Sequence, residues 1–308
     1  MSAVSINTAT AILSQLATEN RRVVSDWRAL ILLRRATLQI APARRRWTTL
    51  PDQVTQMHPL LKQMQRRGEL APIAHTRYLY AVTVPYAQTH TLTMDEHEIL
   101  MELNPYAALC VLSALAFHNL TTDLPRVLHA LVPARGTAGM LPPDTYPDDW
   151  EGIASVRGQR PDTIQRHPVQ WITASPGRYF GVAEYRPSGY PVRVTTPERT
   201  LLDGLLSPEA LGGLDTVLRA WRFARDTVNI ETLVEYVAQF AVAVLRQRVG
   251  FVLEALGMRH PVLDQWQTVV QRGGNSKLLA SAPYAPIYSE RWALSLNAPL
   301  GALYGDGE

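Results

Sequence analysis

Apolar residues recur at helical spacing near the start of the chain. They lie three or four positions apart, so they would share one face of a helix. The pattern predicts a helix over residues 8–38 with a single buried stripe. The residues of this stripe are Val23, Val24, Trp27, Leu30 and Ile31.

A second amphipathic pattern covers residues 59–67, which read PLLKQMQRR and are followed by Gly68. Leu60, Leu61 and Met64 share one face of this predicted helix. The remaining face is polar and basic. Its members are His58, Lys62 and Arg66, flanked by Gln63, Gln65 and Arg67.

Two further patterns flank that helix. Before it, Thr49 and Pro51 provide the cap and first-turn proline expected of a short helix. After Gly68, the segment LAPIAHTRYLYAV predicts two short strands around a turn near residues 75 and 76. Helix, helix, basic helix and hairpin, in that order, indicate a winged helix, and we expect a linker at 84–93.

The second half mixes predicted helices and strands. A helical region runs from residue 94 or 95 to about 119, interrupted at Asn104-Pro105, and its apolar segment ALCVLSALAFH is expected to be buried. A long loop is expected in the proline-rich stretch 133–149. The predicted strands are VLHALVP (127–133), GIASVRG (152–158), VQWITA (169–174), RYFGVAEYR (178–186) and YPVRVTT (190–196), the last two forming a hairpin.

The C-terminal third is predicted to be helical. Thr196-Pro197-Glu198 and Ser207-Pro208-Glu209 both have the cap, proline and early acid of a helix start. An amphipathic helix over 242–256 is expected to end at Gly257. The fold class is therefore α+β. A winged helix-turn-helix domain (1–85) precedes an α+β domain (86–308) with a short mixed sheet and C-terminal helices.

Charge is distributed unevenly between these parts. The net charge is only +3. Residues 1–80, however, contain 12 basic and 4 acidic residues, an excess of 8, whereas the rest contains 18 basic and 23 acidic residues. A basic segment joined to a mildly acidic body predicts a polyanionic partner for the first segment.

Together with the element order, this asymmetry favours double-stranded DNA as that partner. Arginine and lysine can pair with guanine edges, glutamine can pair with adenine, and all three can contact phosphates. We expect the hairpin to reach the DNA backbone or minor groove, and the basic connector at residues 41–51 to contact flanking phosphates. The candidate DNA-binding residues are Arg44, Arg45, Arg46, His58, Lys62, Gln63, Arg66, Arg67, Arg77 and Tyr78.

Signals for catalysis are weak. The chain contains no GxxxxGK[ST], GxGxxG, GxSxG or HExxH motif, and its histidines are scattered, so no enzyme, metal or cofactor is expected. Cys110 is expected in the core, as are Trp221, Trp266 and Trp292. Acidic residues 148, 149 and 151, and Arg246 and Arg248, are interpreted as solvated surface.

No compartment other than the cytoplasm is indicated. Mean hydropathy is −0.08 and no apolar stretch has the length of a bilayer span. The first 22 residues lack a basic region ahead of an apolar core, so no secretory signal is expected.

Two segments of the second half resemble a known family. The run VRVTTPERTLLDGLLSPEALGGLDTVLRA and the later VLRQRVGFVLEALG are similar to the AbiEi antitoxins of type IV toxin–antitoxin systems. Leu60, Leu61, Arg67, Gly68, Leu70 and Tyr78 or Tyr80 also match that family's N-terminal winged helix, and the likeness covers about 45–270. The matching positions are Thr196, Pro197, Glu198, Arg199, Thr200, Leu201, Leu202 and Asp203, then Arg248, Gly250 and Leu253.

The resemblance implies a twofold role. The winged helix would bind inverted repeats in its own promoter and repress the operon. The second domain would counteract a nucleotidyltransferase-like toxin, with or without stable contact. Two alternatives remain open: a winged-helix regulator whose second domain binds a ligand or protein, and a DNA-processing enzyme using Glu198 and Asp203.

Overall fold

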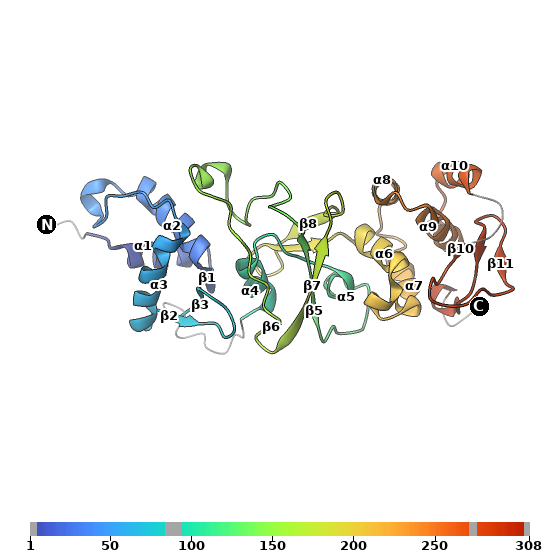
Figure 1. Ribbon diagram of the computed structural model, residues 1–308, viewed down its shortest axis with the longest axis horizontal. Helices are drawn as coiled ribbons and strands as arrows, with labels where there is room; N and C mark the ends of the chain where they lie inside the picture. Colours follow the sequence, from blue (N-terminus) through green and yellow to red (C-terminus); the bar gives the residue numbers. More distant parts are fainter. Residues whose placement is uncertain (1–4, 84–93, 271–275, 305–308) are drawn as a thin grey trace. The chain divides into compact units, whose positions relative to one another are not determined.

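The computed structural model describes residues 5–83, 94–270 and 276–304 of the chain, and its fold is mixed α+β, as predicted (Figure 1). The predicted linker at 84–93 and the boundary within it lie outside the described residues. Contacts divide the chain into two compact units with a different grouping from the predicted domains. The first contains 1–108, 132–173 and 184–193, and the second contains 109–131, 174–183 and 194–308.

The N-terminal part of the first unit is built from three helices and a small sheet. The sheet has strand order β1-β3-β2, and both neighbouring pairs are antiparallel. Short 3-10 turns at Pro42–Arg44 and Val54–Gln56 lie between the second and third helices. The elements are α1 (Thr8–Thr18), β1 (Val23–Ser25), α2 (Asp26–Gln39), α3 (Met57–Arg66), β2 (Leu70–Pro72) and β3 (Leu79–Val82).

The prediction of one helix over 8–38 was wrong, because a strand divides it. The first helix ends before Asn20, which has a φ of 51°. The second starts at the Ser25 cap, whose side chain accepts from the backbone of Arg28. Between them Val23 and Val24 pair with β3. All three residues of β1 are buried, so the strand has no alternation of buried and exposed positions. Val23 and Val24 therefore fit the spacing of the predicted helical stripe instead.

The predictions around the third helix were largely correct. Helix α3 ends where expected, and Gly68 follows it with a φ of 72°. The strands around the turn near residues 75 and 76 are confirmed. The short helix expected from Thr49 and Pro51 is absent, and only the 3-10 turn at Val54–Gln56 forms in that part of the described chain.

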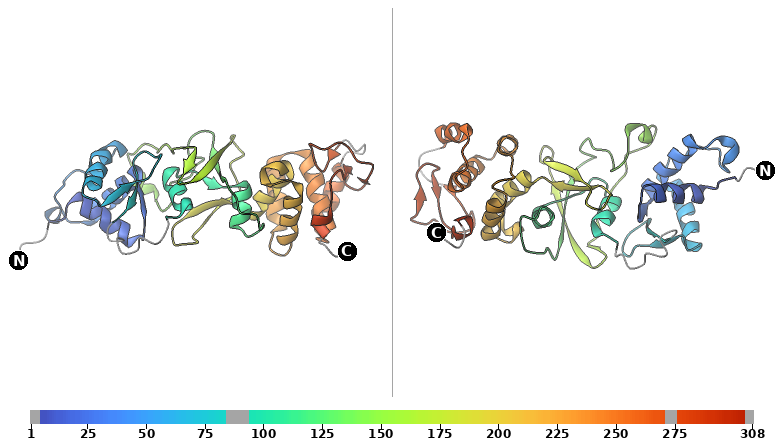
Figure 2. Two further views of the ribbon diagram at one scale, coloured as in Figure 1. Left: turned by 90° about the horizontal axis from the view of Figure 1, so that it is seen from below. Right: turned by 180° about the vertical axis from the view of Figure 1, so that it is seen from behind.

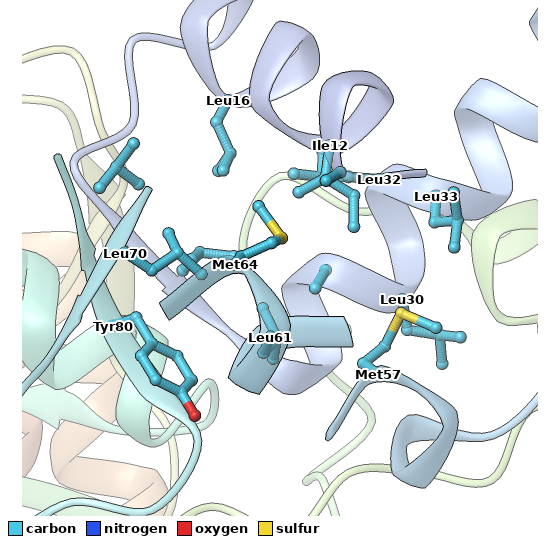
Figure 3. Packing of buried hydrophobic residues seen from close by; sticks show 14 residues of the cluster. Ile12, Leu16, Leu30, Leu32, Leu33, Met57, Leu61, Met64, Leu70 and Tyr80 are labelled. Carbon is cyan, nitrogen blue, oxygen red and sulfur yellow. The ribbon is translucent and has the colours of Figure 1, made fainter. Parts of the chain in front are cut away.

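One apolar core joins these elements. Leu61 and Met64 of α3 are completely buried against Ile12 and Leu16 of α1 and Leu30 of α2 (Figure 3). At roughly 1.5–3 kcal/mol for each large apolar side chain, this burial holds α3 to the other helices. One face of α3 is therefore fixed and the other is left to solvent.

The chain continues through a helix pair and a six-stranded sheet with strand order β6-β7-β5-β4-β9-β8. Four of the five expected strands are confirmed, but residues 152–158 form none, and the two-residue strand β4 interrupts the helical region. The proline-rich stretch is irregular apart from a 3-10 turn at Pro147–Trp150. The elements are α4 (Glu96–Leu103), β4 (Ala108–Leu109), α5 (Val111–Phe117), β5 (Leu128–Pro133), β6 (Thr163–Ile164), β7 (His167–Ala174), β8 (Val182–Tyr185) and β9 (Val192–Thr195).

The second unit contains the C-terminal helices, α6 to α11. Helix α6 packs against α7, α8 and α9 (Figure 2). A small sheet with strand order β10-β12-β11 follows. The elements are α6 (Pro197–Leu206), a 3-10 turn (Pro208–Leu211), α7 (Leu214–Phe223), α8 (Ile230–Phe240), α9 (Ala243–Ala255), α10 (Pro261–Val269), β10 (Ser276–Lys277), β11 (Tyr288–Ser289), β12 (Leu294–Ser295) and α11 (Gly301–Tyr304).

The segment TTPERTLLD (195–203), part of the first of the two family-like runs, leads into α6 and has packing roles. The Thr196 side chain caps the helix, as predicted. Arg199 donates to the Asp203 carboxylate and to the carbonyls of residues 178 and 180, and its guanidinium lies 4.3 Å from the Phe180 ring centroid and 4.7 Å from that of Phe240. These contacts tie the 178–180 segment to α6.

The second family-like run also makes internal contacts, and the expectation of a solvated Arg248 was wrong. Arg248 is buried and donates to the carbonyls of Leu205 and Lys277, which lie at the ends of α6 and β10. A Cβ on Gly250 would lie 2.2 Å from the Trp292 ring, so only glycine fits. Trp221, Trp266 and Trp292 are buried as expected.

Candidate nucleic-acid interface

Helix α3 presents a polar, basic face opposite its buried one. Met57, Leu61 and Met64 are buried, as their spacing predicts. The helix contains no acidic residue, so the charge on its outer face is entirely positive. The exposed side chains of this face and of the turn that ends it are Lys62, Gln63, Gln65, Arg66 and Arg67.

Two other predicted site residues hold the helix to the hairpin. The rings of His58 and Tyr78 stack with centroids 3.5 Å apart and planes 4° apart. His58 Nε2 lies 3.0 Å from the Asp26 carboxylate, and Lys62 Nζ lies 5.9 Å from the Tyr78 ring centroid. Partial burial raises the pKa of Asp26. His58 and Tyr78 therefore act in positioning the turn, and both are only partly exposed.

The turn between β2 and β3 is fixed by a residue far along the chain. Gln159 accepts a hydrogen bond from the backbone N–H of Arg77 at 2.9 Å and donates one to its carbonyl at 2.6 Å. The Arg77 side chain remains exposed. Sequence reasoning missed Gln159, because no periodicity or motif links positions 82 residues apart.

The three arginines of the connector differ from one another. The backbones of Arg44 and Arg46 bond Ile6 in a parallel bridge, with N···O distances of 2.9 and 3.0 Å. Their side chains are exposed, as the phosphate-contact prediction requires. Arg45 is half-buried, and its guanidinium lies 6.0 Å from the Trp47 ring centroid. Arg45 is thus less accessible than its neighbours.

A buried ionic cluster ties β1 and α2 to α4, and sequence reasoning missed it. The Glu102 carboxylate on α4 accepts from Arg28 Nε at 2.8 Å, Arg21 Nη1 at 3.2 Å and Ser25 Oγ at 2.7 Å. Its backbone carbonyl accepts from Trp27 Nε1. We call Arg21, Ser25, Arg28 and Glu102 the Glu102 cluster. All four are at least nine-tenths buried.

Other arginines of residues 1–80 also bond internal groups, so this segment exposes less positive charge than its composition indicates. Arg34 donates to the carbonyls of Pro51 and Glu151, and Arg35 to the Asp149 carboxylate. Burial alone would raise the pKa of Asp149, but the bonds from Arg35 lower it, so Asp149 is not the solvated acid expected. Like Arg21 and Arg28, these arginines bond internal groups, Arg35 a carboxylate and Arg34 two carbonyls. The exposed positive charge of residues 1–80 is therefore concentrated on α3, the turn and the connector.

Glu98 offers a pH test of the same region. Burial raises the pKa of its carboxyl to about 6, partly opposed by a hydrogen bond from the backbone of Arg22. Because the folded pKa exceeds the unfolded value, stability falls as pH rises from about 4.5 to about 6 and then stays level. We expect Glu98→Gln, which keeps the acceptor, to raise the unfolding free energy by up to about 2 kcal/mol at pH 7.5.

Urea unfolding of the two proteins across pH 4.5–7.5 measures this effect. The gain from Glu98→Gln should shrink toward zero at the acid end. A gain of constant size, or a loss at every pH, would contradict the burial argument.

A metal site, a reactive thiol and a membrane-spanning helix are absent from the described residues. Within 5–83, 94–270 and 276–304, no three His, Cys, Asp or Glu side chains are grouped to hold a metal ion. Burial raises the pKa of the Cys110 thiol well above its ordinary value, as suits a core residue. The described helices are all too short or too polar to cross a membrane.

Comparison with known proteins leaves the family open. No family model and no curated protein matches the chain. A crystal structure of the RV2827C protein from Mycobacterium tuberculosis aligns with 98% of this chain and 96% of its own, at 13% identity and a TM-score of 0.48. A likeness at that level decides neither fold nor function.

Proposed function

We propose that the chain is a non-enzymatic DNA-binding antitoxin that represses its own operon and counteracts a nucleotidyltransferase-like toxin. The observation that supports DNA binding best is that α3 has one buried apolar face and one exposed basic face. Its apolar face is fixed in the core, while Lys62, Gln63 and Arg66 face solvent beside no acidic residue of the helix. Long donors held on a rigid helix are what base and phosphate recognition requires.

The element order around α3 supports a winged helix as the DNA-binding domain. Helix α3 follows two helices and precedes the β2–β3 hairpin. In this proposal α3 enters the major groove, where Lys62 and Arg66 pair with guanine edges or phosphates and Gln63 with adenine. The hairpin follows as the wing.

The flanking basic residues would then contact the DNA backbone. Arg77 on the hairpin would reach phosphates or the minor groove, and Arg44 and Arg46 the neighbouring phosphates. The stack of His58 on Tyr78 holds the hairpin against α3, and Gln159 fixes the backbone at Arg77. Such preorganisation lowers the entropic cost of binding.

The antitoxin role is supported by the family-like runs in the second half. Their members cap helices, bond carbonyls or fill the core, which suits a structural signature and gives Glu198 and Asp203 no metal-binding geometry within the described residues. Toxin antagonism need not involve stable contact.

Co-expression with the neighbouring gene tests the antitoxin role. We expect that gene to arrest growth alone and growth to recover when this chain is co-expressed. A frame-shifted copy of this chain's gene is the control. Persistent arrest, or a harmless neighbour, would contradict the role.

A point variant separates repression from protection better than truncation does. Deleting residues 1–90 would remove Arg21 and Arg28, the buried partners of Glu102. Lys62→Ala/Arg66→Ala leaves that cluster intact. We expect this variant to lose repression of a promoter reporter and to retain growth rescue. Loss of both functions at normal protein level would contradict the division of roles.

A further inference from the structure

A cavity of about 430 Å³ opens within the first unit. Three segments line it: residues 104–106 after α4, 132–136 at the end of β5, and 155–160. Its volume falls in the range of small-molecule sites. None of these residues belongs to the exposed face of α3.

The charge of this cavity is strongly positive. Arg135, Arg157 and Arg160 line it, and all three are exposed. None of the described lining residues is acidic, and neither Arg135 nor Arg157 has a carboxylate partner among the residues the structure describes. A concave site lined by one sign of charge concentrates the field and attracts anions.

The walls of the cavity are held in place. A Cβ on Gly158 would lie 2.2 Å from the Asn104 side chain, so glycine is required for this close approach. The buried Asn104 donates to the Gln159 carbonyl and accepts from the Tyr106 backbone. Arg160 donates to the Pro133 carbonyl and to Thr173 Oγ1, both at 3.3 Å. The arginines therefore project from a preformed frame.

We propose that this cavity binds a small phosphorylated ligand. Guanidinium groups match phosphate oxygens bidentately, and three of them around one hollow suit a group with several negative charges. Ser155, Gly136 and Gly158 complete the part of the lining nearest these arginines in sequence. A hollow walled by three segments suits a small molecule better than a duplex, whose backbone would pass over its mouth.

Isothermal titration of the full chain with inorganic pyrophosphate at low salt tests the proposal. We expect one site per chain and at least about tenfold weaker binding in Arg157→Gln/Arg160→Gln. The matched control is Arg166→Gln/Arg225→Gln, which removes two exposed arginines outside the cavity and should bind as the original chain does. The single variant Arg157→Gln, which disturbs no wall contact, should show a smaller loss in the same direction.

A parallel titration with ADP distinguishes the sources of phosphate. Tighter binding of ADP than of pyrophosphate would assign the site to a nucleotide, and equal binding to the phosphate groups alone. Absence of saturable binding, or equal weakening in both double variants, would overturn the proposal. So would a variant that loses duplex DNA affinity while keeping pyrophosphate affinity, since the arginines would then serve DNA.

Discussion

Glu102→Ala is expected to lower the unfolding free energy of the full chain by about 3–5 kcal/mol. The substitution leaves the buried guanidinium of Arg28 without its one carboxylate partner among the described residues, whereas Arg21 keeps those of Glu19 and Asp144. It also removes the acceptor of Ser25 Oγ. A buried charge that has lost its partner costs far more than the pair contributed, because it can neither be hydrated nor deprotonated readily.

Urea unfolding followed by tryptophan fluorescence measures the loss, and Asp215→Ala is the matched control. Asp215 pairs with Arg219 at 2.7 Å on the surface of α7, so its removal should change the unfolding free energy by no more than about 1 kcal/mol. Similar small effects in both variants would show that the Glu102 cluster is hydrated in solution.

Lys62→Ala/Arg66→Ala should weaken binding to the upstream DNA of the chain's own gene by at least about thirtyfold, since each well-placed contact is worth roughly 1–3 kcal/mol. Both side chains are exposed on α3 and neither supports the core. The fold should therefore survive. The dependence of affinity on salt should also become less steep, because fewer phosphates are neutralised.

Fluorescence anisotropy with a labelled duplex gives both quantities. Arg166→Ala/Arg225→Ala removes the same charge elsewhere on the surface and is expected to retain nearly all of the affinity. Equal losses in the two double variants would mean that net charge alone governs binding, and the role of α3 would be wrong.

Sequence patterns predicted the elements whose signals are local. Helix α3 followed from its apolar spacing and Gly68, and α6 from Thr196 and Pro197. The strand β1 was missed because three consecutive buried residues have no alternation to detect. Residues 152–158 have strand-like composition but form a loop, whose Gly158 packs on Asn104. Tertiary contacts, which leave no local pattern in the sequence, determine the structure of both segments.

The candidate interface was predictable only where exposure follows from periodicity. Lys62, Gln63 and Arg66 lie where their spacing placed them. Gln159 could not be foreseen, because its contact with the Arg77 backbone depends on the path of the chain between them. Nor could the role of Arg28 be foreseen. The number of basic residues in a segment gives no sign that one of them will be buried against an acid 74 positions later.

The central claim is that this chain recognises the DNA upstream of its own gene. Anisotropy at physiological salt, with that fragment and a shuffled fragment of equal length and composition, tests it most directly. We predict that the natural fragment binds at least about a thousandfold more tightly. Equal affinity for the two fragments, or no binding to either, would contradict the claim.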